Sequence, residues 1–199
     1  MGIGIRAKSA FFILVFVQML NLPTAGAGNR FIDYQGFSVF HGRSDGTSIG
    51  PDTVDAYEWS TFNYTLGKNM TTWAAFETLL GAGHLETEHY GDTETLEVRV
   101  LTEVHYKFLF LKFGAGIAHL FDDSNLPGLA ESGIHGIISG SAGFRFRFHR
   151  EKKPPVAVSL GYGVEHISSP FKDGDDGDDG WNTGGVFFTL SCPFSMPLT

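Results

Sequence analysis

The sequence predicts an all-β protein, an eight-stranded antiparallel transmembrane β-barrel of the outer-membrane type. Eight segments alternate between apolar and polar residues, and turn-like stretches separate them. The composition is rich in glycine and aromatic residues, with 26 Gly and 19 Phe among 199 residues. The N-terminus has the features of a secretion signal. Together these observations favour a barrel with a polar interior, an apolar exterior and an even number of strands.

The fourth segment shows the alternation most clearly. Its apolar face carries Leu96, Val98 and Val100, and its other face carries Glu97 and Arg99. A periplasmic sandwich or a lipocalin-like barrel would show the same alternation, with the polar face in water. The secretion signal, the aromatic content and the even strand count favour the transmembrane barrel instead. The predicted strands span residues 30–41, 54–66, 70–84, 94–106, 108–120, 136–149, 155–169 and 182–194.

The predicted connections alternate in length. Short turns near 67–69, 107 and 150–154 suit the periplasmic side of an outer-membrane barrel, and longer loops suit the outside. Aromatic residues near the segment ends are expected to form an interfacial girdle. The long loops are predicted at 42–53, 85–93, 121–135 and 170–181. The girdle candidates are Tyr34, Tyr57, Trp59, Trp73, Tyr106 and Trp181.

Residues 1–27 are predicted to be a cleaved signal peptide. Arg6 and Lys8 precede an apolar run over residues 10–20, and small residues follow at 25–27. Residues 28–199 would then form a single barrel domain. The net charge of −8 makes nucleic acid an unsuitable partner. The one cysteine, Cys192, has no zinc-type neighbours in the sequence.

The seventh segment carries the residues of greatest chemical interest. His166 and Ser168 continue the apolar face of Leu160, Tyr162 and Val164, which is expected to look into lipid. Residues i and i+2 of a strand share a face, with their Cα atoms roughly 7 Å apart. A polar pair on such a wall is costly unless it has a use. A serine beside a histidine base is the minimum equipment for attacking an ester.

The final hairpin resembles that of the PagL-type lipid A deacylases and the wider bacterial acyloxyacyl hydrolase family. The resemblance rests on His166-Ile167-Ser168-Ser169 and on Gly180-Trp181-Asn182, and it covers mainly residues 108–194. It implies an enzyme that removes an ester-linked acyl chain from lipid A in the outer leaflet. It also implies roles for four residues: Ser168 as the nucleophile, His166 as the general base, Asn182 at the third position and Ser169 as oxyanion support.

Two alternatives to this enzyme stay open. The first is a catalytically inactive structural or adhesive barrel of the same family, because Ser169-Pro170 and Asn182 depart from the family pattern. The second is a small pore or ligand-binding barrel, and eight strands disfavour a pore because side chains fill so narrow a barrel. Arg99, Glu103, Arg145 and Arg147 are expected to be such filling, and His105 is expected to join their charge network. His41 and His84, among the other histidines, show no metal spacing and have no assigned role.

The loop at 173–179 is a candidate site for Ca²⁺ or another divalent cation, because carboxylates alternate with glycines there. The alternative is a solvated surface loop, and the proposed ester hydrolysis requires no cofactor. The expected partner is lipopolysaccharide in the outer membrane of a Gram-negative-type bacterium, and a homodimer is a further expectation from the resemblance. The candidate metal ligands are Asp173, Asp175, Asp176, Asp178 and Asp179.

Overall fold

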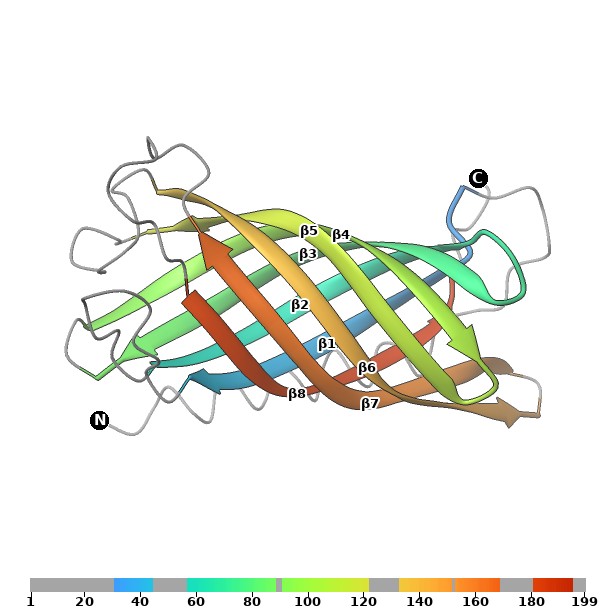
Figure 1. Ribbon diagram of the computed structural model, residues 1–199. Helices are drawn as coiled ribbons and strands as arrows, with labels where there is room; N and C mark the ends of the chain where they lie inside the picture. Colours follow the sequence, from blue (N-terminus) through green and yellow to red (C-terminus); the bar gives the residue numbers. More distant parts are fainter. Residues whose placement is uncertain are drawn as a thin grey trace.

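The eight strands form one closed antiparallel barrel in which each strand pairs with its neighbours in the chain and β8 returns to β1 (Figure 1). The computed structural model describes residues 31–44, 57–88, 91–121, 133–151, 153–168 and 181–194. Among these residues, no helix is long and apolar enough to cross a membrane. The strands are β1 (Tyr34–Ser44), β2 (Tyr57–Asn69), β3 (Ala74–Thr87), β4 (Gly91–Tyr106), β5 (Leu109–Leu120), β6 (Ile134–Arg150), β7 (Lys153–Ser168) and β8 (Trp181–Pro193).

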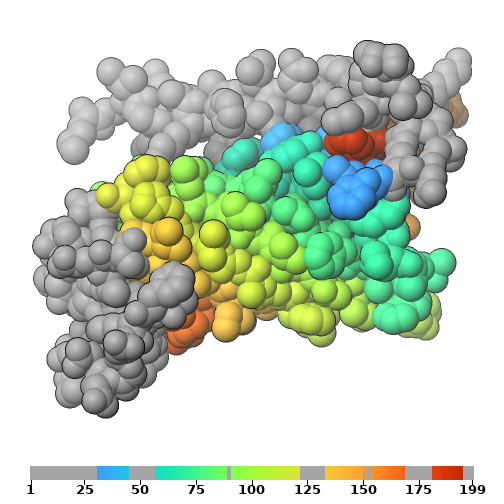
Figure 2. Space-filling view, turned by 90° about the horizontal axis from the view of Figure 1, so that it is seen from above, coloured from blue at the N-terminus to red at the C-terminus, as the bar shows by residue number. Residues whose placement is uncertain are grey.

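The outer wall of the barrel is apolar, as the alternation predicted. On β4 the side chains of Leu96, Val98 and Val100 are 41–51% exposed, whereas Glu97 and Arg99 between them are buried. In Figure 2 the side chains of β2 to β5, coloured teal to yellow, cover one face of this wall in chain order. An apolar exterior around a polar interior is the arrangement that lipid surroundings require. The predicted fold class is therefore confirmed.

The two ends of the barrel differ in their connections. We call the end with the connections 45–56, 88–90, 121–133 and 169–180 the loop end, and the opposite end the turn end. The predicted long loop at 85–93 is wrong, because β3 and β4 continue to Thr87 and from Gly91. Gly91 has a φ of 87°, which glycine adopts without steric cost. The predicted signal peptide and most of the other three long loops lie outside the described residues.

Aromatic side chains close the interior at the loop end. Tyr57, Trp59 and Trp181 are 1–2% exposed and pack with Leu85 and Leu120 in one inward-facing apolar cluster. The prediction that Tyr57, Trp59 and Trp181 belong to an interfacial girdle is therefore wrong. Tyr57 and Trp59 lie on the inward side of β2 with the buried Thr61 and Thr65, and Trp181 lies on the inward side of β8 with Thr183. We call this cluster, which also includes Ala118, Ile137 and Ile167, the loop-end plug.

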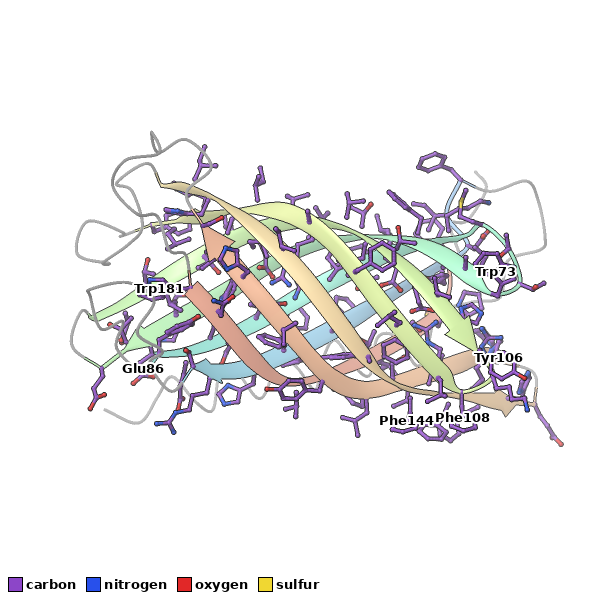
Figure 3. The ribbon with its side chains drawn as sticks, in the orientation of Figure 1. Trp73, Glu86, Tyr106, Phe108, Phe144 and Trp181 are labelled. Carbon is purple, nitrogen blue, oxygen red and sulfur yellow. The ribbon has the colours of Figure 1, made fainter. Side chains whose placement is uncertain are left out.

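Other girdle candidates divide between the two faces. Trp73 and Tyr106 are 57% and 70% exposed at the turn end, where Figure 3 labels them, and they suit an interfacial position. Tyr34 instead points inward, and its hydroxyl donates a hydrogen bond to Glu77 at 2.8 Å. An aromatic residue near a strand end thus belongs to the girdle only where its side chain points outward from the barrel wall.

Ion pairs fill the rest of the interior. Arg99 binds Glu97 and Glu165 below the loop-end plug, and nearer the turn end Arg145 binds Glu103. His105 lies 3.2 Å from Glu103, so its predicted place in the charge network is confirmed. Arg147 is an exception to the predicted filling, because its side chain is exposed. A cavity of about 50 Å³ is left beside Arg99 and Glu165.

Candidate active site at the loop end

Strand register brings His166 and Asn182 together on the outer wall. The two residues stand directly opposite each other on β7 and β8, and directly opposed residues point to the same side of a sheet. Nδ1 of His166 lies 2.9 Å from Oδ1 of Asn182. The register of β7 and β8 therefore brings Asn182 and His166 together across the hairpin.

The contact fixes how the imidazole of His166 is used. An amide oxygen only accepts hydrogen bonds, so Nδ1 of His166 carries the proton and donates to Asn182. Nε2 then has the free lone pair and can accept a proton from a hydroxyl group. A general base in a Ser–His site uses its ring in this way, with one nitrogen held by an orienting partner. A neutral amide orients the ring without supplying the negative charge that would stabilise an imidazolium.

Ser168 is the last residue of β7 and is partly exposed. Its partner on β6 is Gly136, so no side chain stands opposite it. A Cβ at Gly136 would lie 3.9 Å from the Oγ of Ser168, at ordinary contact distance. In the described part of the chain, no hydrogen bond joins the Oγ of Ser168 to the ring of His166. A productive Ser–His contact thus requires rotation of these side chains.

Apolar side chains surround the pair on the same wall. Ile138 faces His166 from β6 and is 61% exposed, and Val164 and Tyr162 below it are 56% and 58% exposed. Val156 lies further along this face but is only 8% exposed, because it packs with other apolar side chains. The polar pair therefore ends an apolar strip against which a fatty acyl chain can lie.

The inner side of the same hairpin is firmly held. Ile167 and Trp181, which flank the site residues in sequence, are part of the loop-end plug. Glu165 is 6% exposed and accepts hydrogen bonds from Arg99 on β4. These inward contacts fix the backbone of β7 and β8, so the outward positions of His166 and Asn182 rest on a rigid scaffold.

Several predicted site residues are not placed. Ser169 and the acidic loop with Asp173, Asp175, Asp176, Asp178 and Asp179 lie outside the described residues. The described ranges contain no group of three or more His, Cys, Asp or Glu side chains that could hold a metal ion. The oxyanion support and the divalent-cation site therefore stay predictions.

A second polar group on the outer wall has no counterpart in the sequence predictions. His41, Ser60, His84 and Glu94 form one continuous row across β1 to β4, each residue directly opposite the next. We call it the His41 row. Finding it requires the strand register, because these residues are far apart in the sequence and form no motif. The alternation alone shows that each of these residues points outward, but it does not show which of them stand opposite each other.

The fold is thus a closed barrel of the outer-membrane type, with a histidine, a serine and an asparagine at the loop end of its apolar wall. Among solved structures, the outer membrane enzyme PagL matches with a TM-score of 0.50 and 14% identity, over 80% of this chain and 99% of PagL. The outer membrane protein Ail of Yersinia pestis matches with a TM-score of 0.43 and 14% identity, over 81% of this chain and 99% of Ail. An outer membrane channel of Pseudomonas putida F1 gives 0.32 and 9%, over 86% of this chain and all of the channel.

These likenesses concern the fold. At 14% identity, the match to PagL shows a shared barrel architecture and no shared activity. No family model matches the sequence, and no curated protein matches it. The function therefore has to be argued from the residues of the site.

Proposed function

We propose that this protein is an outer-membrane esterase that removes an ester-linked acyl chain from lipid A in the outer leaflet. One observation carries the proposal: the 2.9 Å contact that holds His166 against Asn182 on the lipid-facing wall, two residues from Ser168 on the same face. The barrel would insert with its loop end outward, as the short turns at the opposite end suggest. The site then lies at the level of the outer-leaflet acyl esters.

The proposed reaction is a two-step acyl transfer. The Oγ of Ser168 attacks the acyl carbonyl while Nε2 of His166 takes the hydroxyl proton. The tetrahedral intermediate collapses to an acyl-serine, and the imidazolium returns the proton to the leaving alcohol. A water molecule, activated by the same imidazole, then releases the fatty acid and restores the serine. Asn182 contributes by holding the ring with Nε2 free.

An inactive barrel of the same architecture is the second candidate. Two observations favour it: Ser168 makes no hydrogen bond to His166, and the third position is a neutral amide. On this view the polar pair is an interfacial feature that contacts lipid head groups. The two candidates differ in whether removing one hydroxyl group changes the lipid composition of the membrane.

Mass spectrometry of lipid A tests the proposal. Cells would express the wild type, Ser168→Ala or Thr78→Val, which removes another hydroxyl from the described wall, on β3. Heat-modifiable gel mobility would verify insertion of all three proteins. We expect loss of one acyl chain with the wild type and Thr78→Val, and a decrease in activity on the order of 10⁴-fold or more with Ser168→Ala. Identical spectra in which neither the wild type nor Ser168→Ala has removed an acyl chain would support the inactive barrel.

A further inference from the structure

The His41 row contains a side-chain hydrogen bond between a histidine and a serine. Nδ1 of His41 lies 2.9 Å from the Oγ of Ser60, which stands directly opposite it on β2. Both residues are exposed on the outer wall. This is the contact between base and nucleophile that a serine hydrolase needs, and it is already formed here.

His84 on the other side of Ser60 does not compete for this hydroxyl. It stands opposite Ser60 in the register, but its Nδ1 lies 3.2 Å from Glu94 and its Nε2 lies 4.0 Å from Asp92. Both ring nitrogens of His84 therefore face carboxylates of β4 and not the hydroxyl group of Ser60. His41 is left as the base for Ser60: in the tautomer with hydrogen on Nε2, the Nδ1 lone pair of His41 can accept the serine proton.

The row lies at the boundary between polar and apolar parts of the wall. Each of its members is three residues from the loop end of its strand, at Ser44, Tyr57, Thr87 and Gly91. The next outward row toward the turn end is apolar throughout. It consists of Val39, Phe62, Ala82 and Leu96, again each opposite the next.

This placement suits the ester of a membrane lipid. Its acyl chain would lie over the apolar row while its carbonyl reaches Ser60. The arrangement repeats, on β1 and β2, what the wall offers around His166 on β7.

We propose that Ser60 is a second nucleophile for acyl esters of membrane lipids, with His41 as its general base. The Oγ of Ser60 attacks the carbonyl carbon as its proton passes to Nδ1 of His41. The C–O bond to the alcohol then breaks, and His41 returns the proton to the leaving oxygen. Water hydrolyses the acyl-serine in the same way, giving a fatty acid and the free hydroxyl group of Ser60.

The second site is separate from the first but close to it. His41 stands opposite Val186 on β8, four residues along that strand from Asn182. A rise of about 3.3 Å per residue and a strand spacing of about 4.8 Å place His41 roughly 16 Å from His166. Two esters of one multiply acylated lipid can span such a distance, so one bound lipid could present a chain to each site.

A serine-directed fluorophosphonate probe tests this inference without knowledge of the substrate. The full-length protein in lipid vesicles would be labelled, and the modified serine located by peptide mass spectrometry. We expect an adduct on Ser60 in the wild type and in Ser168→Ala. Labelling of Ser60 should slow at least 10²-fold in His41→Gln, since a general base typically contributes that much. Its rate should not change in the control His119→Gln, which alters an outward histidine on β5.

The outcomes separate the two sites. An adduct on Ser60 but not on Ser168 would support the second site and contradict the proposed function of the first. Absence of a Ser60 adduct from a correctly inserted barrel would overturn the inference. So would labelling of Ser60 at the same rate in the wild type and in His41→Gln, because the contact with His41 would then have no chemical consequence.

Discussion

Replacement of Asn182 by aspartate tests the proposed role of the third site residue. The change exchanges the amide that lies 2.9 Å from Nδ1 of His166 for a carboxylate of nearly the same shape. A carboxylate at this position stabilises the imidazolium that forms when Ser168 gives up its proton. Since the new charge appears where the transition state develops a positive charge, the variant should react faster than the wild type.

The size of the effect follows from the geometry. With charge centres about 4 Å apart, the Coulomb energy is about 1 kcal/mol in water and about 4 kcal/mol at an effective dielectric constant of about 20. Asn182 is exposed, and solvent screening lowers the upper of these two energies. We therefore expect the new carboxylate to stabilise the imidazolium by about 1–3 kcal/mol. At 1.36 kcal/mol per tenfold change, the rate of acyl release should rise about 5-fold to about 150-fold.

Purified protein in lipid A vesicles provides the assay, with released fatty acid measured over time. Asn182→Ala is the matched control, because it removes the orienting contact without adding a charge, and it should be slower than the wild type. A rate for Asn182→Asp within twofold of the wild type, in a barrel that inserts normally, would refute the reasoning. The observed contact would then be structural and His166 would not act as the base.

Three further predictions concern the barrel itself. Glu165→Ala leaves Arg99 with one carboxylate fewer and should destabilise the barrel by about 3–5 kcal/mol in urea unfolding, whereas an unchanged midpoint would show the pair to be dispensable. Trp59→Ala removes a buried part of the loop-end plug and should cost about 3–5 kcal/mol; a cost below about 1 kcal/mol would favour an outward, girdle position. Gly114→Ala drives a Cβ into the backbone oxygen of Val100 on β4 and should prevent heat-modifiable folding, but Gly140→Ala, with its nearest contact at 3.7 Å, should fold normally. Equal folding of both glycine variants would contradict the close approach of β4 and β5.

The sequence predicted the wall of the barrel because the period-two alternation has a single cause, the change from lipid to interior at each residue. It predicted the ends of the strands less well. The predicted loop at 85–93 contains Glu86 and Asp92, which are in fact outward residues of paired strands near the loop end. Where the exterior turns polar, alternation no longer distinguishes a strand from a loop. Parity was the more reliable guide, and it would have placed Trp59 inside the barrel with Thr61 and Asn63.

The candidate sites show the same division between local and non-local information. His166 and Ser168 are two residues apart, so their shared face follows from one strand alone. Their contact with Asn182 needs only the neighbouring strand of the same hairpin. The hydrogen bond between His41 and Ser60 joins two strands whose register the long connection 45–56 does not fix locally. Closure of the whole barrel sets that register, because a slip of one residue would turn every side chain of a strand to the wrong face.

The two sites also differ in what each one lacks, and the difference bears on which of them can act. His166 has an orienting partner in Asn182 but no hydrogen bond to its serine. His41 has the hydrogen bond to Ser60, but its other ring nitrogen has no partner among the described residues. A base without an orienting partner must still be held by its neighbours, and a base without a bound nucleophile needs its side chain and that of the serine to rotate. Rotamer changes of side chains that are not buried take picoseconds to nanoseconds, far faster than enzymatic turnover. The missing bond at Ser168 is therefore the smaller obstacle, and the site on β7 and β8 is the better placed of the two to carry the main activity.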